Sequence, residues 1–397
     1  MRNKKIAGAL LRMERLRQGL MLKQVCQGIC ATSYLSKIEH GSADADEGIL
    51  SALFARLGVQ YTQDEAVLAP LREQIAVYHE QYLYGMDKDE TYRALMAQDM
   101  LLTYSPLCAD WLIIRGLERE TVLEYLDALA DCLTDQQRAW RNMLQAWENI
   151  NAPQSLELAR SAAAVLGTSS ALLEVCILAL YQNEYTLIHR LENQLTHLAL
   201  TEGNTYILGC YYDFKGMAYS CLDQDELMMD CYHRAIHLLQ GTRWTDRLCN
   251  IYYNIGATYV FMGKHDQALR YLARAEGTGI WMLAVRHKQA LAYIRMGDLE
   301  KGRAYLALFK KEIDAEENPT EGVQLWYQEA EMECREGFLD DPAYLALMDQ
   351  LLAAFRKEAH FGYIYAFRDV YVKACTRQRQ YKKALEFEQM ISSAMQK

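Results

Sequence analysis

Residues 20 to 41 read LMLKQVCQGICATSYLSKIEHG, and this stretch decides the fold of the N-terminal part of the chain. Its apolar residues recur at helical spacing on either side of a Gly-Ile-Cys turn, which predicts two short helices. Gly41 follows the second helix, and glycine readily adopts the left-handed conformation in which many helices end. The outer face of that helix carries Thr32, Ser33, Ser36 and Lys37. Two short helices joined by a tight turn, the second with small polar and cationic side chains, are typical of a helix-turn-helix that reads the major groove of DNA.

Amphipathic patterns flank this stretch on both sides. Apolar residues at helical spacing over 6–16 and 49–57 predict one helix before it and one after it. Residues 1–60 are therefore expected to form a compact bundle of four or five helices. We expect Arg15 and Glu39 to form a largely exposed ion pair between the first helix and the second helix of the motif, worth about 0–1 kcal/mol. A plain helical hairpin with no nucleic-acid role is the alternative.

The run from Gly28 to Gly41 resembles the helix-turn-helix of XRE-type, lambda-repressor-like regulators. More narrowly, it resembles the variant in PlcR-like and Rgg-like regulators, the peptide-pheromone sensors of the RRNPP group, whose turn is also one residue shorter than the common XRE form. Position in that motif implies base contacts from Thr32, Ser33 and Lys37. The residues that the resemblance assigns to DNA binding are Lys23, Thr32, Ser33, Tyr34, Ser36, Lys37 and His40, with Arg15, Glu39 and Gly41 in structural roles.

The sequence departs from that family where the first helix of the motif begins. The family usually has Ser or Thr there, followed by Gln, whereas this chain has Met21 and Leu22. The change removes a helix N-cap worth about 1 kcal/mol and a polar side chain expected near a phosphate. We expect it to lower DNA affinity more than it alters the docking mode.

Length and hydropathy favour a multidomain protein of the cytoplasm. The chain has 397 residues, 51% of them hydrophobic, which is enough for two or three domains with a large core. No apolar run reaches the ~20 residues needed to span a bilayer. Charged residues interrupt the N-terminal segment throughout, so it does not read as a signal peptide. We therefore expect a cytoplasmic location and no membrane association.

Charge is divided unevenly along the chain. Residues 1–60 hold nine Lys or Arg and five Asp or Glu, a net charge of +4, so the remainder of a chain with net charge −10 carries −14. A basic N-terminal part on an acidic body fits a DNA-binding module joined to a domain that does not bind DNA. The acidic body favours a neutral or basic ligand.

The sequence shows little that predicts catalysis or metal binding. Its eleven cysteines are scattered without a C-x-x-C motif, and reduced core thiols are expected. His233 and His237 form an i, i+4 pair with no third ligand in a recognisable motif, so a solvated helix face is the better interpretation. Walker, dinucleotide-binding and G-x-S-x-G motifs are absent from the sequence. We expect no enzyme activity, metal or cofactor.

Beyond a linker expected at residues 61–70, every segment of 71–397 reads as helix, and the five prolines are expected to mark helix breaks. The clearest repeat runs from Asn250, with Gly256, Tyr259, Gly263 and Ala268 at tetratricopeptide spacing. Copies before and after it are offset by 40 and 34 residues, close to the ~34-residue period of this repeat. The predicted fold is all-α: a lambda-repressor-like helix-turn-helix bundle followed by a tetratricopeptide-like α-solenoid of five to eight helix pairs.

Stacked helix pairs curve, and their first helices line a concave groove suited to an extended peptide. Asparagine there offers a donor and an acceptor to a peptide backbone, and tyrosine offers apolar area with a polar tip. The groove residues expected from the repeat register are Asp213, Met217, Asn250, Tyr253, Asn254 and His287. The alternative is that these side chains fill the core between repeats.

The leading hypothesis is a homodimeric transcriptional regulator that binds double-stranded DNA at an inverted repeat and senses a short signalling peptide, as in quorum sensing. The resemblance to the RRNPP group implies each of these partners. One alternative is a helix-turn-helix regulator whose repeat domain binds a protein, such as a kinase or sigma factor. The other is a scaffold without DNA activity, which Met21 and Leu22 would favour.

Overall fold

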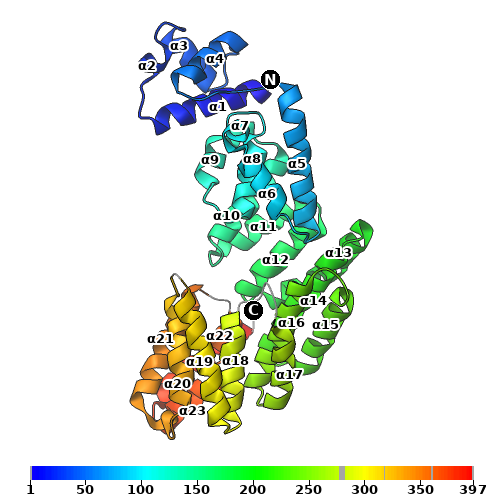
Figure 1. The fold of residues 1–397 in the computed structure, drawn as a ribbon, viewed down its shortest axis with the longest axis vertical. Coiled ribbons are helices and arrows are strands. Elements are labelled where there is room, and N and C mark those ends of the chain that lie inside the picture. Colours follow the sequence, from blue (N-terminus) through cyan, green and yellow to red (C-terminus); the bar gives the residue numbers. More distant parts are fainter. Residues whose placement is uncertain (1, 277–281, 317, 359–360, 396–397) are drawn as a thin grey trace. The chain divides into compact units, whose positions relative to one another are not determined.

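The computed structural model describes residues 2–276, 282–316, 318–358 and 361–395, and within these ranges every regular element is helical (Figure 1). This confirms the predicted all-α class. The chain divides into two compact units, residues 1–171 and 172–397. None of the helices in the described ranges is both long and apolar enough to cross a bilayer.

The first unit begins with the expected four-helix bundle. Its helices are α1 (Arg2–Arg17), α2 (Leu22–Cys26), α3 (Thr32–Glu39) and α4 (Glu47–Arg56). Their apolar faces meet in one core that includes Leu35 and Phe54, both without exposed surface. Helix α1 crosses α3 at Gly8, where an added Cβ would lie 2.0 Å from the carbonyl oxygen of Ile38. The small side chain therefore allows the close approach of the two backbones.

Helix α3 ends in the way that Gly41 predicts. Gly41 has φ +65°, and its N–H donates to the carbonyl of Ile38 at 2.9 Å. The N–H of Ser42 donates to the carbonyl of Lys37 at 2.8 Å. This pair of hydrogen bonds is the Schellman arrangement, in which glycine avoids the steric cost of positive φ.

The linker expected at residues 61–70 is not extended over its length. Helix α5 (Glu65–Leu83) begins inside it, with the side chain of Asp64 accepting from the N–H of Ala66 at 2.9 Å. Pro70 lies within this helix, so the break expected there does not occur. Pro70 is the sixth residue of α5, so it lacks the N–H that would otherwise donate to the carbonyl of Ala66. The buried stripe that includes Leu68 and Leu71 keeps the helix packed despite that loss.

The rest of the first unit continues the same core. Its elements are α6 (Asp89–Met96), α7 (Asp99–Thr103), α8 (Cys108–Leu117), α9 (Leu123–Ala128), the 3-10 helix η1 (Ala130–Cys132), α10 (Asp135–Glu148) and α11 (Pro153–Leu166). Helix α1 packs against α9 and η1, and residues of 104–133 share one apolar cluster with α1–α4. The buried carboxylate of Glu14 accepts from the hydroxyl of Tyr104 at 2.7 Å. Residues 1–60 are therefore packed into the unit and not separated from it by a flexible tether.

The second unit follows α12 (Ser169–Tyr181), which spans the division between the units. Its elements are α13 (Tyr185–Glu202), α14 (Thr205–Cys221), α15 (Asp225–Leu239), α16 (Thr245–Phe261), α17 (His265–Ala275), α18 (Met282–Arg295), α19 (Leu299–Ala315), α20 (Glu321–Glu333), η2 (Phe338–Asp340), α21 (Pro342–Glu358), α22 (Phe361–Tyr365), α23 (Arg368–Arg377) and α24 (Tyr381–Met395).

Helix pairs stack in chain order in this unit, as the repeat predicts. Successive pairs α14–α15, α16–α17 and α18–α19 are closely packed, and the first helices of neighbouring pairs touch along α14, α16, α18 and α20. Gly256 of α16 faces Leu272 of α17 so closely that an added Cβ would lie 2.7 Å from its side chain. Helix α22 returns to contact α14. The C-terminal segment is thereby brought against the layer formed by the first helices.

Candidate functional site

The residues expected to contact DNA lie on the open face of α3 and near the start of α2. Lys23, Thr32, Ser33, Lys37 and His40 are exposed, while Tyr34 and Ser36 are half-buried. Neither lysine makes an ion pair with any part of the chain that the structure describes. Small side chains and uncommitted cations on one helix face can approach a major groove and its phosphates.

Three of these residues already make contacts within the chain. The hydroxyl of Tyr34 donates to the carbonyl of Asp44 at 2.6 Å, which supports the loop after α3. His40 Nδ1 lies 2.7 Å from the carbonyl oxygen of Ser36, and the Thr32 hydroxyl lies 3.4 Å from Cys26 Sγ. These contacts fix side chains at both ends of α3 and leave Ser33 and Lys37 projecting from its middle.

Arg15 and Glu39 form the expected ion pair, but it is buried. Arg15 Nε and Nη2 each donate to one oxygen of Glu39 at 2.7 Å, and Nη1 donates to the carbonyl of Leu20 at 2.9 Å. The two side chains are 11% and 2% exposed, so the expectation of an exposed pair is wrong. The hydrogen bonds to Glu39 raise the pKa of Arg15 above its ordinary value. The pair locks α3 onto α1 with a fixed geometry.

Helix α2 begins without a side-chain cap, as the sequence indicates. Met21 occupies the capping position, is 74% exposed, and accepts no hydrogen bond with its side chain. The Gln24 side chain accepts from the N–H of Met21 at 2.7 Å, which restores half of a capping box.

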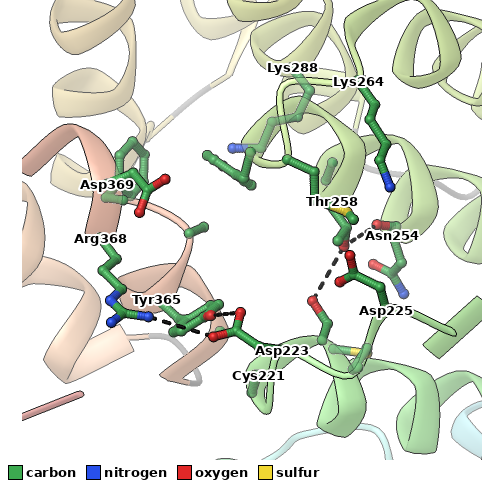
Figure 2. A pocket seen from close by; sticks show the side chains of 18 of the residues that line it. Cys221, Asp223, Asp225, Asn254, Thr258, Lys264, Lys288, Tyr365, Arg368 and Asp369 are labelled. Carbon is green, nitrogen blue, oxygen red and sulfur yellow. Dashed lines mark hydrogen bonds and ion pairs between the residues drawn. The ribbon is translucent and has the colours of Figure 1, made fainter. Parts of the chain in front are cut away.

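In the second unit a cavity of about 540 Å³ opens among α14, α15, α16, α18 and the segment from α22 to α23 (Figure 2). Met217, Tyr253 and Asn254, three of the six residues expected in the groove, line it. The polar side chains of Ser220 and Thr258 lie beside them. The lining mixes apolar and polar side chains, and a cavity of this volume is large enough for a ligand.

Asp213 does not line the cavity but lies behind Asn254. It is buried, and its Oδ1 accepts from Asn254 Nδ2 at 3.0 Å while Oδ2 lies 2.7 Å from Arg247 Nη2. Burial raises the pKa of Asp213, and the guanidinium of Arg247 acts in the opposite direction. Because a carboxylate only accepts, the amide nitrogen of Asn254 must face Asp213. The Asn254 carbonyl oxygen is then available as an acceptor.

Asn250 and His287 also lie away from the cavity lining. Asn250 is half-buried on α16. His287 has no exposed surface; its ring stacks on Trp326 with centroids 4.8 Å apart, and Nε2 lies 3.5 Å from Glu329 Oε2. Burial lowers the pKa of His287 well below its ordinary value. The continuous strip expected from the repeat register is therefore interrupted at α18.

Sequence reasoning missed the residue next to His287 and the wall from the C-terminal segment. Lys288 lines the cavity in place of His287, and Tyr365 and Arg368 line it from the other side. The Tyr365 hydroxyl donates to Asp223, and Arg368 Nη1 lies 3.6 Å from the other oxygen of Asp223 (Figure 2). Lys288 lies in the polar run from Arg286 to Gln289 of α18, and this run gives no local signal for which of its side chains faces the cavity. Nothing local predicts that residues 365–368 meet residue 223.

The cavity wall carries as many acidic as basic side chains, whereas the chain as a whole has a net charge of −10. The lining carries Asp223, Asp225 and Asp369 together with Lys264, Lys288 and Arg368. Arg368 is held by Glu388, with Nε and Nη2 at 3.0 and 2.8 Å from its oxygens. The acidic net charge of the body therefore does not describe the cavity, which can receive ligand groups of either sign. In the described residues no cluster of His, Cys, Asp or Glu is arranged to hold a metal ion.

No protein-family model matches the sequence, and no curated protein matches it. Among solved structures, the chain is similar to the apo form of the quorum sensor NprR from B. thuringiensis. The match has a TM-score of 0.55 at 12% sequence identity and covers 83% of this chain and 99% of that one. At this identity the likeness shows that the two proteins share a helical fold.

Proposed function

We propose that this protein is a transcriptional regulator of the RRNPP type, in which α1–α4 bind DNA and the cavity of the second unit binds a short signalling peptide. One observation carries the proposal: a recognition helix with an uncommitted polar face and a ligand-sized cavity occur in the same chain. The likeness of its fold to a quorum sensor supports this combination.

The geometry of α3 supports DNA binding. Thr32 and Ser33 are small, so the helix backbone can lie deep in a major groove, and Lys37 extends from the same face. Residues 1–60 carry a net charge of +4, which favours association with phosphates. A single recognition helix reads only a few base pairs. The protein therefore acts as a homodimer on an inverted repeat, as two-fold regulators with this motif do.

The cavity supports a peptide ligand. Its volume of about 540 Å³ lies within the range of ~300–1,000 Å³ typical of ligand pockets. Asn254 offers a carbonyl oxygen to a backbone N–H, and the hydroxyls of Ser220 and Thr258 add further polar contacts. Tyr253 and Phe261 supply aromatic surface for side chains. An extended peptide has unpaired backbone groups and needs such a mixed lining.

The test is to isolate the full-length protein from cells that express it at its natural level. Mass spectrometry after denaturation detects bound peptide, and sequencing of crosslinked DNA detects bound sites. We expect one short peptide, an inverted-repeat site, and a change in DNA affinity when the peptide is added. Recovery of a protein partner without peptide would favour the partner-binding regulator. Absence of any enriched DNA would favour the scaffold.

A further inference from the structure

Lys288 occupies an unusual position in the wall of the cavity. Only 2% of its surface is exposed, and its Nζ lies 4.6 Å from the ring centroid of Phe261, 5.0 Å from that of Trp326 and 5.6 Å from that of Phe367. Three aromatic faces therefore surround the amine within the distance at which a ring attracts a cation. Figure 2 shows the side chain at the edge of the cavity.

The amine has no carboxylate partner. Within the described residues no carboxylate oxygen lies within 4.0 Å of Nζ, and its polar neighbour is His287 Nδ1 at 3.3 Å. Burial lowers the pKa of Lys288 to about 7. A buried ammonium without a counterion is costly, and in this wall the aromatic faces offset only part of that cost.

The nearest acids are committed elsewhere. Glu333 accepts two hydrogen bonds from Arg295, at 2.9 and 2.6 Å. Glu329 accepts from the hydroxyl of Tyr344 at 3.3 Å, and burial raises its pKa well above the ordinary value. Neither acid of α20 lies within ion-pair distance of the Lys288 amine, so among the described residues the amine is left to the aromatic rings and His287.

We propose that Lys288 receives a carboxylate of the ligand that occupies this cavity. The inference rests on the peptide-binding function proposed above and specifies which ligand group that site recognises. The other cations of the lining are less suited to the role. Arg368 is held by Glu388 and Asp223, and Lys264 is exposed, with its amine 5.4 Å from the ring of Tyr259. At the buried Lys288 a carboxylate is attracted more strongly than at an exposed lysine, because less water screens the pair.

Two sources of that carboxylate are possible: the C-terminus of the peptide or an Asp or Glu side chain. The probes are three random pentapeptide libraries. The first lacks Asp and Glu and ends in a free carboxylate, the second has the same composition but ends in an amide, and the third ends in an amide and includes Asp and Glu. Native mass spectrometry of the full-length protein at pH 7 measures the fraction that retains each library.

We expect the wild type to retain at least one carboxylate library at least fivefold better than the carboxylate-free library. Retention of the first identifies the C-terminus as the source, and retention of the third identifies a side chain. Lys288→Met keeps a long apolar side chain against the aromatic wall and should bring all three libraries to equal retention. Lys382→Met, the matched control, removes the same charge from a 90% exposed position of α24 outside the cavity lining and should change the preference less than twofold. Thermal unfolding confirms that each variant is folded.

The pH dependence gives a second test. A pKa of about 7 leaves the Lys288 amine mostly charged at pH 6.5 and mostly neutral at pH 8.5. Because a carboxylate pairs with the charged amine, the preference should fall toward equal retention over this range. The charged and titratable groups that face the amine are His287 and Arg295 on α18, Glu329 and Glu333 on α20, and Lys264, Arg368 and Asp369 around the cavity. Burial lowers the pKa of His287 and raises that of Glu329, and Arg295 is paired with Glu333. Lys288→Met therefore serves as the reference for this test: its preference should not change between pH 6.5 and 8.5.

Equal retention of the three libraries by the wild type would overturn the assignment. So would a preference that persists in Lys288→Met or that does not change between pH 6.5 and 8.5. If the wild type retains no library at all, the peptide-binding function itself fails, and the inference fails with it.

Discussion

Helix α3 and the cavity of the second unit are built in opposite ways. On α3, Ser33 and Lys37 project into solvent, and what they contact must come from another molecule. The buried ion pair of Arg15 and Glu39 holds α3 in a fixed position against α1. In the cavity, polar side chains of the wall already contact one another, as Tyr365 does Asp223.

The exposed face of α3 is therefore a fixed surface, whereas the wall of the cavity is an adaptable one. The exposed side chains Ser33 and Lys37 stand on a helix that the buried Arg15–Glu39 pair holds in place, so under the proposed function this face needs no rearrangement to enter a groove. The cavity includes Tyr365 and Asp223, whose contact joins α22 to the turn after α14. A ligand that entered could compete for such groups.

Arg15→Ala should destabilise the packing of α1 against α3 and leave the second unit unchanged, the largest difference expected between the two regions. It leaves the Glu39 carboxylate, 2% exposed, without its partner, and breaking a buried pair in this way costs about 3–5 kcal/mol. Hydrogen exchange of the full-length protein should show loss of protection in α1 and α3 but not in α16 and α18. Arg12→Ala, an exposed position on the same helix, is the control. An equal loss of hydrogen-exchange protection in both units would mean that the Arg15–Glu39 pair does not stabilise α1 and α3 alone.

Lys37→Ala should weaken DNA binding by about 1–3 kcal/mol if the side chain contacts a base, with no change in unfolding. The measurement is a titration of the operator recovered by crosslinking, at fixed salt. Lys382→Ala removes the same charge from an exposed position of α24, where the side chain is 90% exposed, and should leave affinity unchanged. Wild-type affinity in Lys37→Ala would remove this residue from the recognition face.

Tyr365→Phe tests the adaptable wall. It deletes the hydroxyl that donates to Asp223 and should lower the free energy of unfolding of the second unit by about 0.5–1.5 kcal/mol. The effect stays small because the Asp223 side chain is exposed and water can replace the lost donor. Urea unfolding followed by hydrogen exchange in α14 and α22 measures it. Tyr381→Phe, at an exposed site on α24, is the control. A loss as large as that of Arg15→Ala would make this wall as rigid as the recognition helix.

Met21→Ser should have the smallest effect, and in the opposite direction. Serine can accept from the backbone at the start of α2, a gain of about 0.5–1 kcal/mol that unfolding of the first unit would report. DNA affinity should rise as well, because a polar side chain is restored near the phosphates. Met296→Ser, just after the end of α18, provides no cap and should give no gain. A neutral result would show that Gln24 already supplies the whole cap.

How far the sequence predicts each region follows from how its residues are connected. The recognition helix is one contiguous stretch, so spacing alone identified its turn, its outer face and the end at Gly41. The Arg15–Glu39 pair was predicted as well, but its burial depends on how α1 and α3 cross at Gly8, which spacing does not reveal. In the second unit, the repeat register placed Met217, Tyr253 and Asn254 on the cavity side.

The register was wrong by one residue at α18. Successive residues of a helix point about 100° apart, so this small shift placed His287 in the core and Lys288 at the cavity. The wall formed by residues 365–368 could not be predicted, because its contact with residue 223 joins segments that share no local pattern. Pro70 misled for a different reason: its local preference was outweighed by the burial of the stripe that contains Leu71.

The hydrogen bond from Tyr104 to Glu14 has a consequence for how this protein can be recombined with others. Regulators are often treated as exchangeable heads and bodies, cut where a motif ends. Here a cut at residues 61–70 would remove the residues of 104–133 that share the apolar cluster of α1–α4 and would leave the Glu14 carboxylate without one of its donors. A chimaera that keeps the bundle of α1–α4 with its whole core must carry the chain through residue 133. The segment that must be transplanted as one piece is therefore longer than the helix-turn-helix motif itself.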